Sequence, residues 1–173
     1  FETSYRLMYE NNSILMDFLR NTGIPIPRVF YTAAEFTLNL ALKTVLEGDL
    51  DIHKIHHIMG EIKKWNVPVD SLDLEFIIRR RIEELMDELY THTPDLAILQ
   101  RVEKKLHILP LLPFEINLWY VQNIYFRMAK TVYKEILQGV KSRDKNKAHW
   151  IEEFKKVGQC LFFNIDAVLP RDS

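Results

Sequence analysis

Three residues at regular spacing have side chains that could bind a metal ion. His53, His57 and Glu61 follow one another at intervals of four, which puts them on one face of a helix. Imidazole nitrogens and a carboxylate in that arrangement suit a first-row metal such as zinc. The same face is also the polar side of an amphipathic helix, opposite an apolar stripe that begins at Ile52. No His-Glu-x-x-His pattern accompanies it, so we expect a solvated face with no bound metal and no cofactor.

Aromatic and amide side chains are concentrated between residues 118 and 126. Trp119, Gln122, Asn123 and Tyr125 all fall in this segment. Aromatic rings can stack on the apolar faces of sugars while amides bind hydroxyl groups, so the segment is a candidate ligand or interface site. Aromatic residues at helical spacing also form ordinary cores or contacts between domains. Both interpretations stay open.

Gln122 falls on the side of its predicted helix that faces the core, and a buried amide needs hydrogen-bonding partners. The sequence offers Asn39, which shares a polar stripe with Glu35, and Asn12 near the N-terminus. Glu35 and Asn39 are therefore added to the candidate site residues.

Other sequence features offer no catalytic residue. The Gly-rich patterns that bind nucleotide phosphates are absent. Cys160 lies in an apolar stretch without a neighbouring base, which is typical of a packed thiol. The basic run Arg79-Arg80-Arg81 is followed by Glu83, Glu84 and Asp87, which can pair with it on a solvated helix face. His92, His107 and His149 are scattered singly, and we expect no catalytic residue in the chain.

Helical periodicity continues along the whole chain, and Gly and Pro residues punctuate it. The predicted helices cover about 3–21, 28–47, 52–64, 94–109, 115–138 and 148–163, with a fourth helix that Asp70 or Ser71 caps and whose inner stripe reaches Leu89. The first is expected to bury the stripe Tyr5, Met8, Leu15 and Leu19. The second is apolar on most sides and should be the central helix. No strand-like alternation competes, so we predict an all-α fold, a single-domain bundle of about six to seven helices over residues 1–173.

Capping signals give the expected ends of these helices. Asp51 should cap the third helix and Asn66 should end it. Thr93-Pro94-Asp95 reads as N-cap, first helical proline and acidic first turn. Gly139 is the expected C′ residue of the sixth helix, a polar loop follows at 142–147, and the tail at about 165–173 should be frayed or disordered.

Composition excludes several classes of function. Lys and Arg total 23 and Asp and Glu total 24, a net charge of −1, which argues against nucleic acid and anionic membrane as partners. No apolar run approaches the ~20 residues of a membrane span. A single cysteine fits a reducing compartment, and we expect a cytoplasmic protein. The chain begins at Phe1 without Met, which predicts a domain from a longer polypeptide.

Several spaced residue groups resemble a known family. They are Tyr5-Arg6, Ala34-Glu35-Phe36 with Leu38-Asn39, Lys64-Trp65-Asn66-Val67, and Asn117-Leu118-Trp119 with Gln122-Asn123 and Tyr125. Together they resemble the uncharacterised helical domain at the C-terminal end of certain bacterial and archaeal proteins related to glycoside hydrolase family 57. The similarity runs from about Tyr5 to Phe163. It implies an upstream barrel-like catalytic domain that acts on α-glucans or related polysaccharides and carries its own catalytic carboxylates.

The resemblance implies a non-catalytic accessory domain that docks on the upstream catalytic domain of the same chain and helps to shape its substrate cleft. Polysaccharide is a second partner that this interpretation allows. The alternative is a free-standing helical module that binds a partner protein through its aromatic surface. A homo-oligomer, or a metalloenzyme built on His53, His57 and Glu61, would also be compatible with the sequence.

Overall fold

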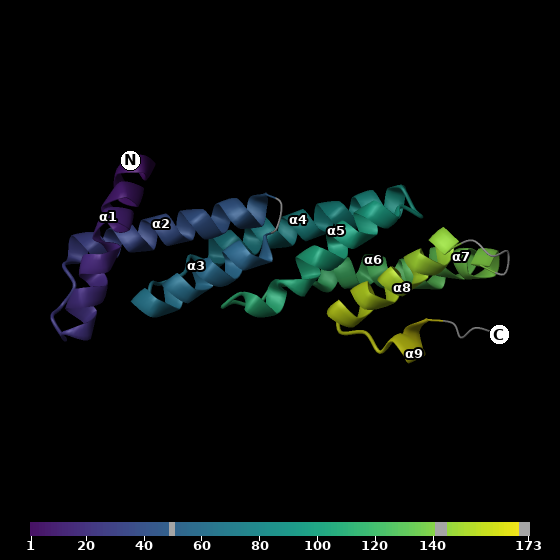
Figure 1. Ribbon diagram of the computed structural model, residues 1–173. Coiled ribbons are helices and arrows are strands. Elements are labelled where there is room, and N and C mark those ends of the chain that lie inside the picture. Colours follow the sequence, from purple (N-terminus) through teal and green to yellow (C-terminus); the bar gives the residue numbers. More distant parts are fainter. Residues whose placement is uncertain (49–50, 141–144, 170–173) are drawn as a thin grey trace. The chain divides into compact units, whose positions relative to one another are not determined.

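The computed structural model describes residues 1–48, 51–140 and 145–169, and within these ranges the chain is helical with no strand (Figure 1). The prediction of an all-α fold is confirmed. The elements are α1 (Glu2–Asn21), α2 (Arg28–Glu47), α3 (Ile52–Trp65), α4 (Ser71–Thr91), α5 (Leu96–His107), the 3-10 turn η1 (Leu109–Leu111), α6 (Trp119–Lys130), α7 (Val132–Val140), α8 (Lys145–Cys160) and α9 (Ile165–Val168).

The contacts within the chain divide it into two compact units, Phe1–Leu74 and Glu75–Ser173. The boundary falls inside α4, where the helical pattern continues without Gly or Pro. For this reason sequence analysis places no boundary there. The expectation of one helical domain over 1–173 stays a prediction.

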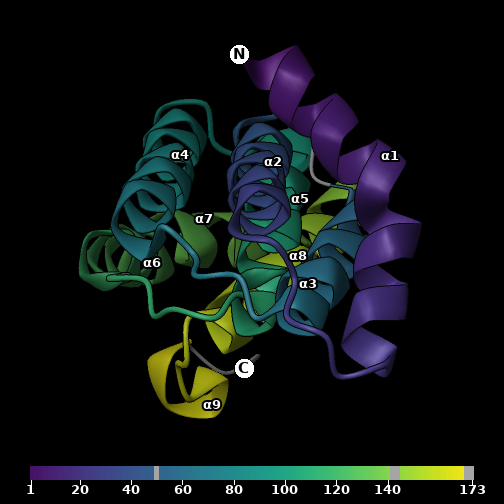
Figure 2. The ribbon, with the colours of Figure 1, turned by 90° about the vertical axis from the view of Figure 1, so that its left-hand side faces the viewer.

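The first unit is built around α2, which packs against both α1 and α3 (Figure 2). Leu38, Leu42 and Leu46 recur at four-residue intervals and are buried, as an apolar helix face requires. Within this unit α2 is central, and its predicted place at the centre of the whole chain stays a prediction. Asp51 caps α3 by accepting hydrogen bonds from the backbone N–H groups of His53 and Lys54.

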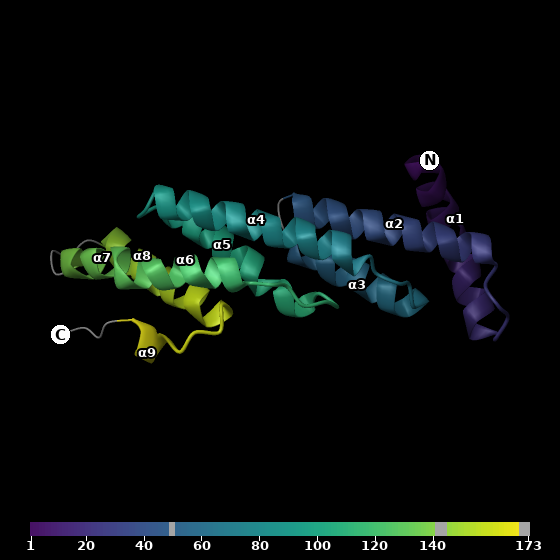
Figure 3. The same cartoon turned by 180° about the vertical axis from the view of Figure 1, so that it is seen from behind.

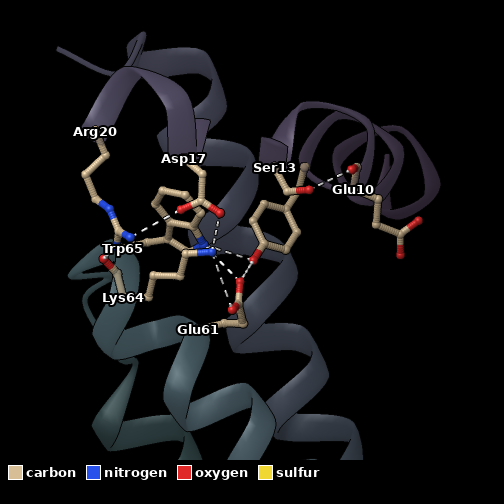
Figure 4. Close-up of polar contacts among 8 residues, drawn as sticks. Glu10, Ser13, Asp17, Arg20, Glu61, Lys64 and Trp65 are labelled. Carbon is tan, nitrogen blue, oxygen red and sulfur yellow. Dashed lines mark hydrogen bonds and ion pairs between the residues drawn. The ribbon is translucent and has the colours of Figure 1, made fainter. Parts of the chain in front are cut away.

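Polar side chains connect α1 to α3 in the first unit (Figure 4). The Tyr9 hydroxyl donates to Glu61 Oε2 at 2.5 Å, and Trp65 Nε1 lies 3.0 Å from the Tyr9 oxygen and 3.1 Å from Glu61 Oε2. About two turns further along α1, Lys64 Nζ pairs with Asp17 Oδ2 at 2.6 Å. Burial and the bond to Glu61 raise the pKa of Tyr9, so the phenol stays protonated and continues to donate.

The buried face of α1 differs from the predicted stripe. Tyr9 and Met16 are its buried residues, whereas Leu15 of the predicted stripe is exposed. Leu7 and Phe18 are exposed as well. Because apolar residues occupy two adjoining faces of α1, periodicity alone could not tell which face packs on α2.

The second unit has an aromatic core in which α8 packs against α5 and α7 (Figure 3). Tyr125 of α6 is fully buried and stacks on Phe154, with ring centroids 4.4 Å apart. Trp150 stacks on the same Phe154 at 4.8 Å. The Tyr125 hydroxyl donates to the Phe154 carbonyl at 3.1 Å, which satisfies its one buried polar group.

The long sixth helix predicted over 115–138 is two helices, α6 and α7, separated at Thr131. The Thr131 hydroxyl donates to the Arg127 carbonyl at 2.9 Å. Such a side-chain bond competes with the backbone hydrogen bonds of the helix and often bends it. Thr131 has non-helical φ and ψ of −114° and −83°. Gly139 lies within α7, one residue before its end, and is not the predicted C′ residue.

Two other predicted ends also shift. α5 begins at Leu96 because Asp95 is its N-cap, accepting from Ile98 N at 3.0 Å, so Thr93 is not the cap. Ile165–Val168 form α9 where the sequence predicts a frayed tail, and the tail residues 170–173 lie outside the described part of the chain. Half of the predicted polar loop, at 142–144, also falls outside it, and the other half, 145–147, is helical because it begins α8.

Candidate functional site

A surface hollow of about 690 Å³ in the second unit lies between α4 and α6. We call its ring-bearing part the aromatic patch, which consists of Tyr90, Trp119, Tyr120 and Phe126. The polar residues that line the same hollow are Asp87, Asn123, Arg127, Lys130 and Thr131. All four rings of the aromatic patch are exposed.

Trp119 is the most exposed ring of the patch, with 70% of its surface accessible. It is the first residue of α6, and its backbone N–H donates to the Asn117 side-chain oxygen at 3.0 Å. Asn117 thereby satisfies one of the donors that a helix start leaves free. Asn123, one turn later in α6, donates to the Trp119 carbonyl at 2.8 Å. The start of α6 is therefore fixed while the indole ring points into solvent.

Charged groups contact two other rings of the patch, Tyr120 and Tyr90. The Tyr120 hydroxyl donates to Asp87 Oδ1 at 2.9 Å, and this bond raises the pKa of Tyr120. The guanidinium of Arg127 lies 5.9 Å from the centre of the Tyr90 ring, within the range of a cation–π contact. The hollow thus offers flat apolar surfaces beside fixed hydrogen-bonding groups. Asp87 is the one carboxylate among the described residues that line it.

The structure separates the four candidates on α6. Trp119 and Asn123 line the hollow, whereas Tyr125 is part of the core. Gln122 is half-buried, and its amide donates to the Leu161 carbonyl at 3.1 Å. The predicted partners of Gln122 were therefore wrong: the amide bonds to a backbone carbonyl near the end of α8.

Asn39 and Glu35 belong to the first unit, where Asn39 makes hydrogen bonds that hold the local structure. The Asn39 amide donates to the carbonyls of Glu35 and Pro68, each at 2.9 Å, and its oxygen accepts from Asp70 N at 2.9 Å. These bonds fix the segment between α3 and α4. Asn12 donates to the Met8 carbonyl one turn earlier in its own helix.

The three metal candidates of α3 are not brought together. Glu61 accepts the bonds from Tyr9 and Trp65, while His53 and His57 line a different hollow of about 680 Å³ with Arg6. No group of metal-ligating atoms containing these three residues forms in the described parts of the chain. Sequence spacing alone could not show that the Glu61 carboxylate accepts a hydrogen bond from Tyr9 of another helix.

A different set of potential metal ligands does come together in the second unit. Ligand atoms of Glu103, His107 and Cys160 all lie within 4.8 Å of one another. The spacing of Glu103 and His107 is a visible signal, but the contact with Cys160 depends on how α5 packs on α8.

The Arg79–Arg81 run forms the expected ion pairs with Glu83 and Glu84.

Comparisons of the chain with protein-family models, with curated proteins and with solved structures found no match. The resemblance to the helical domain of proteins related to glycoside hydrolase family 57 stays a prediction. Among the described helices, none is both long and apolar enough to cross a lipid bilayer.

Proposed function

We propose that this chain is a non-catalytic helical accessory domain of a cytoplasmic carbohydrate-active protein, and that it docks on a catalytic domain through the aromatic patch. The observation that carries the proposal is the exposure of Trp119 in a helix whose other face is fully packed. The assignment to a carbohydrate-active protein depends on the residue groups that resemble the family domain.

The chemistry of the patch supports a binding role. Trp, Tyr and Arg are the residue types that dominate the energetics of protein interfaces, and Trp119, Tyr120 and Arg127 adjoin here. Exposed rings gathered in one place mark interaction sites on soluble proteins. Polar groups of Asp87 and Asn123 at the same hollow would set the orientation of the bound surface.

The same hollow lacks the arrangement of a glycosidase. That reaction normally uses a pair of carboxylates on either side of the scissile bond, whereas Asp87 is the one acid among the described lining residues and is already bonded to Tyr120. We therefore expect no new reducing ends when the chain is incubated with α-glucans. Purified chain that hydrolyses them, and loses that activity in an Asp87→Asn variant, would contradict the proposal.

The docking test uses a Trp119→Ala variant and the catalytic domain expressed separately from the same reading frame. We expect the variant to bind that domain at least tenfold more weakly in isothermal titration calorimetry, because truncating a central Trp at an interface costs about 2 kcal/mol or more. Its Tm should stay close to wild type, since the ring is exposed. Ile14→Ala is the control, as Ile14 is an exposed apolar residue of α1 outside the patch. Equal binding by wild type and Trp119→Ala would contradict the proposed docking surface.

A second candidate function, a module that binds a partner helix, is favoured by α1. Leu7, Ile14 and Phe18 are exposed and share one helical face, at the spacing that fits a groove on another protein. An Ile14→Asp variant separates the candidates: it would weaken binding to a partner at α1 and leave docking at the aromatic patch unchanged.

A further inference from the structure

We propose that Glu103, His107 and Cys160 form a binding site for a divalent transition-metal ion, and that zinc is the metal the three side chains fit best. Their ligand atoms already lie within 4.8 Å of one another. The site is distinct from the aromatic patch and does not depend on the proposed docking function.

Two packed helices hold the three ligands. Glu103 and His107 are one turn apart near the C-terminal end of α5, and Cys160 is the last residue of α8. α5 and α8 pack on each other along apolar residues such as Leu99 and Val157, which are fully buried. The ligands stand at the margin of this apolar seam, where Glu103 and Cys160 are half-buried and His107 is 67% exposed in its side chain. An ion can therefore reach the site from solvent.

The donor set determines the metal. Zinc binds thiolate sulfur at about 2.3 Å and imidazole nitrogen or carboxylate oxygen at about 2.0–2.2 Å, usually with tetrahedral geometry. Three protein ligands with water in the fourth position is an established zinc arrangement. The thiolate disfavours magnesium and calcium, which prefer oxygen ligands.

A small movement of side chains completes the site. His107 Nδ1 lies 4.0 Å from Glu103 Oε1, while neighbouring ligand atoms around a tetrahedral zinc ion lie roughly 3.5 Å apart at these bond lengths. The exposed imidazole of His107 can rotate to close that difference.

Charge balance also supports a divalent cation. The three side chains supply one thiol, one carboxyl group and one imidazole. When zinc binds, the sulfur–zinc bond forms as the thiol proton leaves to solvent. One thiolate and one carboxylate then neutralise the two positive charges, and neutral His107 adds none.

Metal binding is tested with chelator-treated chain, zinc sulfate and cobalt chloride as probes. We expect one equivalent of zinc to remain after gel filtration and to raise Tm, because a ligand that binds the folded state stabilises it. Cobalt in the same site should give a thiolate-to-metal charge-transfer band. The Cys160→Ser variant should lose that band and bind zinc at least tenfold more weakly.

His107→Ala and His57→Ala serve as a matched pair of variants, because both histidines are exposed and both lie on helices. His107→Ala should lose the zinc equivalent and His57→Ala should keep it. Chain that binds no zinc, or Cys160→Ser and His107→Ala variants that bind it like wild type, would overturn the proposal. Zinc lost only in His57→Ala would also overturn it and place the metal on α3.

Discussion

At the scale of single residues, the tightest constraint is the contact between Gly158 and Tyr125. A Cβ atom at Gly158 would lie 2.2 Å from the Tyr125 hydroxyl oxygen and 2.4 Å from Ile165 Cδ1. Real carbon atoms do not approach other atoms this closely, and Tyr125 is fully buried in the packed core, while Ile165 is half-buried. The hydroxyl is held by its bond to the Phe154 carbonyl. Only glycine at position 158 allows this arrangement.

We expect Gly158→Ala to destabilise the protein by about 1–3 kcal/mol, because the added methyl group overpacks the core. Urea denaturation measures this change. Gly60→Ala is the control: Gly60 lies inside α3 with nothing within 4 Å of an added Cβ. That substitution should stabilise the chain by about 0.5–1 kcal/mol, since alanine is the better helix former. A Gly158→Ala variant as stable as wild type would contradict the packing described for Tyr125.

At the scale of the elements, sequence patterns predicted where helices lie along the chain. They predicted less well which face of a helix is buried and where a helix is interrupted. Asp51 is the N-cap of α3 and Asn66 ends it with a left-handed φ of 52°, both as predicted, because capping depends on local chemistry. The break at Thr131 was missed, because threonine is compatible with a helix until its side-chain bond and the surrounding packing are known.

The residues of the candidate site could be predicted from the sequence only where the signal is local. Trp119 and Asn123 stand out because ring and amide are adjacent within one segment. Asp87 and Tyr90 come from α4, and no local pattern shows that α4 supplies the other wall of the hollow. Tyr125 has the same composition signal as Trp119, yet it faces the core. Only the direction in which α6 packs distinguishes the two rings.

The N-cap of α5 gives a test at this scale. Asp95→Ala should lower the free energy of unfolding by about 1 kcal/mol, because it removes the acceptor for Ile98 N. Thr93→Ala should cost less, since the Thr93 hydroxyl bonds the Leu89 carbonyl of α4 and caps no helix start. Chemical denaturation of both variants gives the comparison. The opposite ranking would show that the helix begins at Thr93.

At the scale of the whole molecule, each unit contains a buried tyrosine whose raised pKa should make stability depend on pH. Burial is the first cause of the raised pKa of both Tyr9 in the first unit and Tyr125 in the second. A tyrosine in the unfolded chain has a pKa near 10. Since the folded pKa is higher, the folded state keeps protons that the unfolded state releases. The stabilisation is therefore complete below about pH 10 and is lost as pH rises above it.

We expect the free energy of unfolding to fall between about pH 10 and pH 11, and Tyr9→Phe and Tyr125→Phe each to make that fall less steep. Urea midpoints measured at closely spaced pH values provide the slope. Lysine titration contributes equally to wild type and variants, so the difference between the curves isolates the tyrosines. A slope that neither substitution changes would contradict the assignment. Tyr31→Phe is a suitable control, because Tyr31 is only half-buried.

The placement of the three tryptophans makes the chain a source of three separate optical signals. Trp65 is 4% exposed in the first unit, Trp150 is 1% exposed in the second, and Trp119 stands in solvent on the aromatic patch. An aqueous quencher such as iodide should therefore remove the red-shifted emission of Trp119 and leave the emission of the two buried indoles. Replacing two of the three tryptophans by phenylalanine would leave one fluorophore. Trp65 or Trp150 alone would report the unfolding of its unit, and Trp119 alone would report binding of a partner at the aromatic patch.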